Sequence, residues 1–241
     1  MKLIDTHFHL DHYSNHEYWY NEINRLEQYT LCVTNTPEIY YSCKKIYPES
    51  KFIKFALGFN PQQIKDISFN KRLFLHQLST TKYVGEVGLD FSKRYIDTKD
   101  KQIEVFDFIC KESAVKHKIL SVHIRNSEKE TFEIMKKNNV TKAIIHWYSG
   151  SVQMMQHYID EGYYFSVNAN MCITNNGKKI ISAIPTDRIL VESDGPFTKI
   201  ESSKYKPIAL SKTYALINSI VKEKNFEHIV FDNFNRLLSD D

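Results

Sequence analysis

Short apolar segments alternate with longer amphipathic ones along the whole sequence, and this alternation restricts the fold more than any other feature. Apolar runs bounded by turn residues predict strands, whereas apolar residues at helical spacing predict the helices between them. Strands are expected at residues 3–9, 31–33, 52–57, 83–90, 119–125, 143–150, 163–167 and 188–196. Strands that alternate with helices in this way predict a parallel sheet.

Eight such strands favour a closed α/β fold, the (β/α)8 barrel of the TIM type. A barrel of this kind would nearly fill the 241 residues, so we expect one domain over residues 1–241. An open, doubly wound sheet is less well supported, because no Gly-x-Gly-x-x-Gly motif follows the first strand. The content of 42% hydrophobic and 25% charged residues is that of an ordinary globular protein.

Side chains that bind metals stand on these expected strands. His7 and His9 are two residues apart, so an extended strand points both imidazoles to one face. Glu86 lies in an apolar strand between Gly85 and Gly88, where a carboxylate must be paired, protonated or bound to a cation. A metal site is therefore predicted, although an isolated His-x-His pair is more often structural.

Later strands end in similar residues. His123 and His146 stand toward the ends of the fifth and sixth expected strands, and Glu192 and Asp194 stand near the end of the eighth. A single strand-end histidine is usually structural, but equivalent positions on several strands converge on one face of a barrel. We therefore expect His7, His9, Glu86, His123, His146 and Asp194 to form one site.

Four imidazoles and two carboxylates exceed the protein ligands that one zinc ion usually takes, so two divalent ions are predicted. His7, His9 and Asp194 are assigned to one ion and His123 and His146 to the other. Glu86 is assigned as the shared, catalytic ligand. Asp194 is also expected to take a proton from the attacking water, and Glu192 to orient a ligand histidine. The mixed ligands suit Zn²⁺, Mn²⁺ and, less well, Mg²⁺, and the predicted reaction is hydrolysis.

Five motifs together resemble the TatD family of metal-dependent deoxyribonucleases, which are amidohydrolase-like barrels. In family order, they are Asp5-Thr6-His7-Phe8-His9-Leu10-Asp11, Gly85-Glu86-Val87-Gly88-Leu89-Asp90, Val122-His123-Ile124-Arg125, His146-Trp147-Tyr148-Ser149-Gly150-Ser151 and Glu192-Ser193-Asp194-Gly195-Pro196. The resemblance covers residues 1 to about 200. It implies a 3′-to-5′ exonuclease or a related DNase that uses Mg²⁺ or another divalent ion.

The loop after the third strand departs from the family pattern. Family members usually carry Gly-Ile-His-Pro-His there, and this chain has Gly58-Phe59-Asn60-Pro61-Gln62. Asn60 and Gln62 still offer hydrogen bonds to a substrate phosphate but cannot donate protons as histidines do. This loop, Gly195 and the compact length resemble QatD, the divergent TatD-like member of the Qat anti-phage system. That narrower resemblance implies protein partners from a defence operon.

Further substrate contacts are predicted beside the metal ligands. Arg125 follows a ligand histidine and is the first candidate for a phosphate contact, ahead of Lys93 and Arg94, whose alternative is a solvated surface charge. Trp147 and Tyr148 follow His146 and are candidates to stack a base of single-stranded DNA, with packing as the equal alternative.

The remaining features predict where the protein acts and leave other functions open. Four widely spaced cysteines predict reduced thiols in a cytoplasmic protein, and we expect neither a signal peptide nor a membrane span. A net charge of +3 neither requires nor excludes DNA. One alternative is a hydrolase of an amide or ester, and another is a binding subunit of a defence complex.

Overall fold

The computed structural model describes residues 2–200 and 202–239. Two compact units make up the chain. Unit 1 consists of Met1–Cys32, Glu49–Lys54 and Tyr164–Asp241, and unit 2 of Val33–Pro48 and Phe55–Tyr163.

Strands and helices alternate as expected, and each of the eight expected strands has a counterpart among β1–β8. The strands are β1 (Ile4–Phe8), β2 (Tyr29–Cys32), β3 (Ile53–Phe55), β4 (Tyr83–Asp90), β5 (Ile119–Arg125), β6 (Ala143–His146), β7 (Tyr164–Val167), β8 (Ile189–Val191), β9 (Lys199–Ile200) and β10 (Ser203–Lys204). The α-helices are α1 (His16–Arg25), α2 (Pro37–Ile46), α3 (Lys71–Leu78), α4 (Lys99–Val115), α5 (Glu128–Lys137), α6 (Val152–Asp160), α7 (Asn175–Ala183), α8 (Leu210–Val221) and α9 (Phe226–Leu238). Short 3₁₀ helices are η1 (Leu10–His12), η2 (Pro61–Lys65), η3 (Ile96–Thr98) and η4 (Pro207–Ala209).

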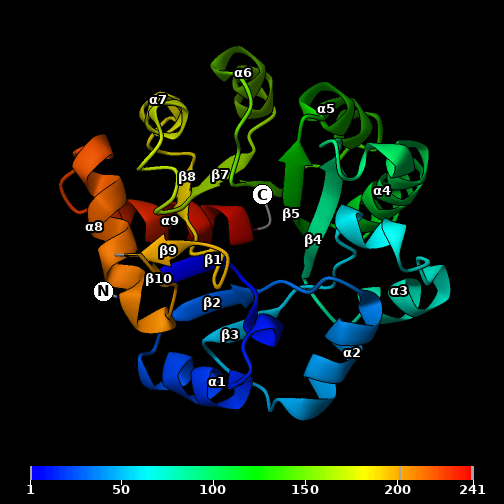
Figure 1. Ribbon diagram of the computed structural model, residues 1–241, viewed down its shortest axis with the longest axis horizontal. Coiled ribbons are helices and arrows are strands. Elements are labelled where there is room, and N and C mark those ends of the chain that lie inside the picture. Colours follow the sequence, from blue (N-terminus) through cyan, green and yellow to red (C-terminus); the bar gives the residue numbers. More distant parts are fainter. Residues whose placement is uncertain (1, 201, 240–241) are drawn as a thin grey trace. The chain divides into compact units, whose positions relative to one another are not determined.

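In unit 1, parallel strands bring the first and last parts of the chain together. β1 pairs with β2, and β7 pairs with β8, both in parallel (Figure 1). Beyond the end of β8, the Asp194 N–H donates to the His7 carbonyl at 2.9 Å, and the His9 N–H donates to the Gly195 carbonyl at 2.9 Å. The segment after β8 therefore runs along the end of β1, close to its histidines.

In unit 2, β4, β5 and β6 pair in parallel, with α4 and α5 also belonging to this unit (Figure 1). Their register sets Gly88 beside His123 and His123 beside His146. Gly88 has φ +139°, and an added Cβ would lie 2.0 Å from the His123 carbonyl oxygen, so only glycine fits there. This close approach holds β4 against β5 at His123, and Glu86 lies two residues before Gly88 on β4.

The predicted ends of the sixth and eighth strands differ most from the structure. β6 ends at His146 because Trp147 turns the chain with φ +39°, and β8 ends at Val191, with Asp194 at φ +48°. The antiparallel β9–β10 hairpin was not expected, because two-residue strands carry too few residues for an alternating pattern.

Cys32, Cys43, Cys110 and Cys172 are all buried. Among the described residues, no helix combines the length and the apolar character that crossing a membrane would require.

Candidate metal centre

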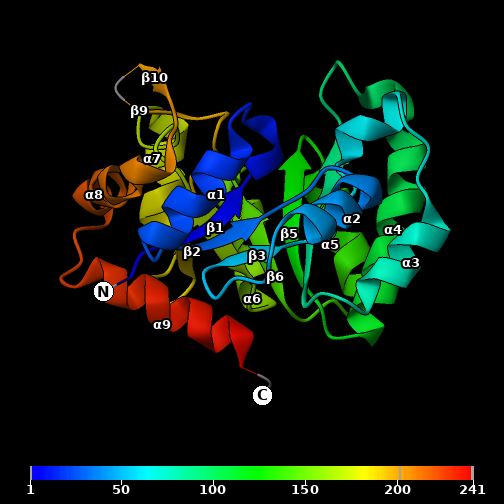
Figure 2. The ribbon, with the colours of Figure 1, turned by 90° about the horizontal axis from the view of Figure 1, so that it is seen from below.

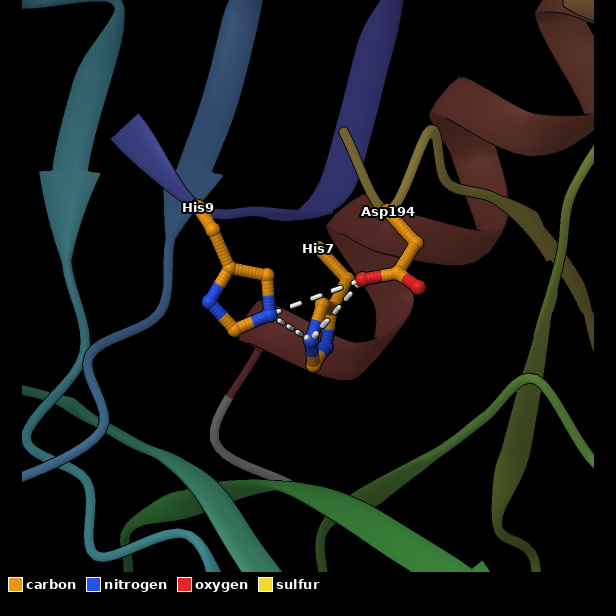
Figure 3. Close-up of side chains that lie close together, drawn as sticks. All are labelled: His7, His9 and Asp194. Atoms are coloured by element: carbon orange, nitrogen blue, oxygen red, sulfur yellow. Dashed lines mark hydrogen bonds and ion pairs between the residues drawn. The ribbon is translucent and has the colours of Figure 1, made fainter. Parts of the chain in front are cut away.

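His7, His9 and Asp194 form the first cluster, which lies within unit 1 (Figure 3). The Nε2 atoms of the two histidines are 3.2 Å apart. The Asp194 Oδ1 atom lies 3.5 Å from the His9 Nε2 and 3.9 Å from the His7 Nε2. All three side chains are buried, and Figure 3 shows both rings turned toward the carboxylate. Three potential ligand atoms therefore face one point.

These spacings fit a divalent metal ion. Ligand atoms bonded at about 2.1 Å are about 3.0–3.4 Å apart in octahedral or tetrahedral arrangements, close to two of the three separations seen here. Imidazole and carboxylate are also ligand types that transition metals accept. The residues of the first cluster thus match an ion in both chemistry and spacing.

The first cluster is held by a buried carboxylate that the sequence analysis did not single out. Asp5 on β1 accepts a hydrogen bond at Oδ1 from the Ser193 N–H (2.8 Å), and at Oδ2 from the Ser193 hydroxyl. Burial raises the pKa of Asp5 to about 7, although the bonds from Ser193 oppose this rise. Asp5 thereby ties β1 to the residue that immediately precedes Asp194.

Glu192 is fully buried beside the first cluster. Its carboxylate accepts hydrogen bonds from the Ser166 hydroxyl and from the Asn168 side chain, the latter at 2.9 Å. A carboxylate oxygen also lies within 4.8 Å of a ring nitrogen of His7. That Glu192 orients a ligand histidine stays a prediction.

Glu86, His123 and His146 form the second cluster, which lies within unit 2. The Glu86 Oε1 atom is 2.8 Å from the His123 Nδ1 and 3.6 Å from the His146 Nε2. Glu86 and His146 are buried, and the His123 side chain is 14% exposed. One carboxylate oxygen thus approaches both imidazoles, which again suits a cation with nitrogen and oxygen ligands.

Asn60 precedes η2 and Gln62 lies in its first turn, and both side chains donate to acidic side chains of β4. The Asn60 Nδ2 donates to the Glu86 Oε2 at 2.8 Å, and the Gln62 Nε2 donates to the Asp90 Oδ2 at 2.8 Å. The Asn60 Oδ1 also accepts from the Gln62 N–H at 2.9 Å, which caps η2. These amides were predicted to face substrate, whereas in the structure they orient the carboxylates around the second cluster.

Asp90, at the end of β4, completes this network on the other side of His123. Its Oδ2 atom is 3.3 Å from the His123 Nε2, so His123 lies between two carboxylates. Burial lowers the pKa of His123, but the hydrogen bonds to Asp90 and Glu86 outweigh it and raise this pKa to about 9. Burial likewise raises the pKa of Asp90, and the bonds from His123 and Ser92 bring it below its ordinary value.

The predicted substrate contacts divide into accessible and inaccessible residues. Arg125, Lys93 and Arg94 are exposed, and Trp147 is half-buried. Tyr148 is 1% exposed, and its hydroxyl donates to the Ser151 carbonyl at 3.0 Å. The prediction that Tyr148 stacks a base is therefore wrong, because its ring packs in the core near Tyr158.

Asp5, Asp11 and Asp90 are the acidic residues near the clusters to which the sequence analysis gave no role. Asp11 lies in η1, within 4.8 Å of His9 and His12. Its Oδ1 atom is buried and has no hydrogen-bond partner among the described residues. All three aspartates lie within motifs shared with the TatD family. Nothing else in the sequence indicates a role for them, because their partners are distant in sequence or depend on the fold.

The comparison with solved structures establishes the fold class. The crystal structure of a TatD homologue from Escherichia coli matches with a TM-score of 0.83 and 18% identity, over 98% of this chain and 97% of that one. This likeness confirms the expected α/β barrel of the TIM type.

Sequence relatives and a family model then give the family. An uncharacterised metal-dependent hydrolase from Buchnera aphidicola is 26% identical over 270 residues, which cover 99% of this chain and all of that protein. Deoxyribonuclease Tat-D from Schizosaccharomyces pombe is 30% identical over 122 residues, 49% of this chain and 39% of that protein. The family model described as TatD related DNase matches residues 4–239. The chain therefore belongs to the TatD family.

Proposed function

We propose that this protein is a metal-dependent nuclease that hydrolyses phosphodiester bonds of DNA, in the manner of a 3′-to-5′ exonuclease. The observation that carries the proposal is the convergence of His7, His9 and Asp194, whose ligand atoms have the spacing of a coordination shell. The family match and a relative named as a deoxyribonuclease support the choice of reaction and substrate.

Two divalent ions, Mg²⁺, Mn²⁺ or Zn²⁺, are proposed, one for each cluster. His7, His9 and Asp194 would hold one, and His123 and His146 the other, with Glu86 as the shared ligand predicted from the sequence. When bound, such ions stabilise the negative charge of a phosphoryl group and make a bound water more acidic.

The chain's own residues would orient these groups and accept a proton. The Asp194 Oδ1 faces both histidines, so its Oδ2 is the atom proposed to take the proton of the attacking water. Ser193 and Asp5 fix the backbone beside Asp194, which keeps this oxygen in place. Asn60 holds the Glu86 Oε2 and so limits rotation of that carboxylate. Arg125 and the half-buried Trp147 remain the proposed contacts to phosphate and base.

A cleavage assay tests this proposal. Purified protein is incubated with end-labelled single-stranded and double-stranded DNA, and with RNA, across Mg²⁺, Mn²⁺ and Zn²⁺. We expect DNA shortening that requires the ion and that Asp194→Asn abolishes. Intact DNA in every condition, with metal analysis showing full occupancy, would contradict a nuclease.

Hydrolysis of an amide or ester is the second candidate. It is suggested by the loop in which Asn60 and Gln62 stand where family members usually carry histidines. The clusters themselves suit either reaction, since an ion polarises a carbonyl as well as a phosphoryl group. Turnover of an amide that His123→Ala abolishes, by a protein that leaves DNA intact, would select this candidate.

The narrower resemblance to QatD leads to a proposal about context. We propose that the protein acts in the cytoplasm, with protein partners, in defence against phage. If its role there is binding alone, a His7→Ala/His9→Ala variant should protect cells as well as the unsubstituted protein. If hydrolysis is needed, this variant should give no protection.

A further inference from the structure

Phe197 is held next to the first cluster by a tight turn. The Phe197 N–H donates to the Asp194 carbonyl at 2.8 Å, and the Thr198 N–H donates to the same oxygen at 3.3 Å. The centroid of the Phe197 ring lies 5.1 Å from that of His9 and 5.0 Å from that of His12, edge to face in both cases. The ring is thus fixed three residues from one candidate ligand and in contact with another.

The same ring is 52% exposed, although it belongs to a large apolar residue. Single exposed apolar residues are common and by themselves need no explanation. Phe197 differs from such residues because one side of its ring contacts the imidazoles of His9 and His12 beside the proposed reaction centre, while the rest of the ring is exposed to solvent. An aromatic ring in this position offers a surface on which a nucleobase can stack.

The sequence after Phe197 leads into β9 and β10, which are labelled in Figure 2 and contribute two lysines. β9 and β10 pair antiparallel with Lys199 directly opposite Lys204, and both side chains are exposed. Like charges directly opposite each other are unfavourable in a two-stranded sheet, and a bound anion would relieve this repulsion. Phosphate groups of a nucleic acid supply such anions.

One hydrogen bond ties this hairpin to the rest of unit 1, and a second closes the hairpin at its base. The Lys199 N–H donates to the Asn170 side chain at 3.2 Å, and the Tyr205 N–H donates to the Thr198 carbonyl at 3.0 Å. Tyr205 is buried, and its carbonyl accepts from the Tyr13 hydroxyl at 2.8 Å. Gly195 leaves room for this packing, since an added Cβ would lie 2.4 Å from the Tyr205 ring. The ring and the lysines are therefore presented from a fixed base.

We propose that Phe197 stacks the nucleobase next to the scissile phosphodiester, and that Lys199 and Lys204 contact phosphates of the same strand. The ligand is the unpaired end of a nucleic acid strand, because a base must leave its own stack to lie on the ring. This inference rests on the proposed nuclease function and adds the subsite that binds its substrate.

Binding and cleavage of labelled oligonucleotides test the stacking. We compare Phe197→Ala, Phe197→Trp and the control Ile173→Ala, which removes another exposed apolar side chain of unit 1. Fluorescence of a single-stranded oligonucleotide with 2-aminopurine as its 3′-terminal base falls when that base stacks. With Phe197→Ala we expect about 10- to 100-fold weaker binding and loss of the quenching. Phe197→Trp should keep both, and Ile173→Ala should match the unsubstituted protein.

An oligonucleotide with a 3′-terminal abasic site separates stacking from a general loss of activity. For this substrate, Phe197→Ala should cleave as the unsubstituted protein does, because no base is present to stack. DNA that is cleaved with the same KM by both proteins, on both substrates, would overturn the subsite and leave the nuclease function intact. DNA that the unsubstituted protein neither binds nor cleaves would overturn the nuclease function, and the subsite with it.

The lysines are tested by salt dependence. Lys199→Ala/Lys204→Ala should reduce the slope of log affinity against log salt by about 1.4 for single-stranded DNA, as expected for two lost phosphate contacts. An unchanged slope would remove the hairpin from the subsite, and this measurement is independent of Phe197.

Discussion

The two candidate metal-binding clusters differ in the distances between their side chains. In the first cluster, two imidazole nitrogens and one carboxylate oxygen converge at 3.2–3.9 Å, which suits a central cation better than direct bonding. In the second cluster, Glu86 lies 2.8 Å from the His123 Nδ1 and accepts a further bond from Asn60. The spacing of the first cluster therefore suits a central ion, whereas the second cluster contains the shorter side-chain contacts.

The shorter contact in the second cluster should oppose metal binding there. An ion that enters the second cluster must replace the contact between the Glu86 Oε1 and the His123 Nδ1, which are 2.8 Å apart, and displace the proton between them. In the first cluster the Nε2 atoms of His7 and His9 are 3.2 Å apart. We therefore expect the first cluster to bind its ion more tightly, and the affinity of the second to depend more strongly on pH.

The largest loss of DNA cleavage is expected from a substitution in the first cluster. Asp194→Asn keeps the shape of the side chain but removes its charge and its ability to take a proton. We expect DNA cleavage to fall by about 10³-fold or more, since general-base catalysis alone contributes 10²–10⁴-fold. Steady-state cleavage of a labelled oligonucleotide, with Asp187→Asn as an exposed control, measures the loss. Equal losses in both variants would assign the effect to charge in general.

A smaller loss is expected from the residue that orients His123. Asp90→Asn removes the carboxylate 3.3 Å from the His123 Nε2 and leaves the proposed ligands in place. Replacing such a partner typically lowers metal affinity or activity by about 10- to 100-fold. Titration with Mn²⁺ should show weaker binding of one ion only. Weaker binding of both ions would mean that Asp90 acts on the whole fold.

The network around His123 also predicts how stability depends on pH in the ion-free protein. The pKa of His123 is raised from 6.5 to about 9, so the folded state binds this proton more tightly than the unfolded state does. The stabilisation is complete below pH 6.5 and is lost as the pH rises through about 9, an effect of roughly 3 kcal/mol. Urea unfolding in EDTA from pH 6 to pH 10 measures it.

The control for this experiment is His123→Gln, which cannot take up a proton in this range. Its unfolding free energy should change less between pH 6.5 and 9 than that of the unsubstituted protein. Parallel curves for the two proteins would show that another group is responsible.

The smallest loss of cleavage is expected from a substitution in the segment after β3 that departs from the family pattern. Gln62→Leu removes the donor to Asp90 without touching a proposed ligand. We expect cleavage to fall about 3- to 10-fold, less than for Asp90→Asn, because the loss acts through one more residue. Gln63→Leu is the matched control, since Gln63 is also half-buried and adjacent. Gln62→His, which restores the family residue, should recover activity, and a further loss would show that the amide itself is required.

Long apolar strands and the residues at their ends could be predicted from the sequence. The bounds of β4 and β5 agree with the predicted ones, because each is a long apolar run that ends where polar residues begin. The parallel pairing of β5 and β6 then sets His123 directly beside His146. This is why residues that are far apart in the chain could be assigned to one site before the structure was known.

Side-chain partners could not be predicted in the same way. Asp5 and Ser193 are 188 residues apart, and no local pattern reveals that one accepts from the other. Asn60 was expected to face substrate, but a buried carboxylate needs donors, and Glu86 lies within reach. Tyr148 was assigned from its place next to His146, yet the turn at Trp147 directs it into the core.

Counting bound ions tests the central claim most directly. Mn²⁺ is titrated into the metal-free protein and its free concentration is followed by electron paramagnetic resonance. We expect two ions per chain for the unsubstituted protein, with one bound more tightly. His7→Ala/His9→Ala should lose the tighter ion, and His123→Ala the weaker one. Two ions that persist in both variants, or the absence of any bound ion in the unsubstituted protein, would contradict the account.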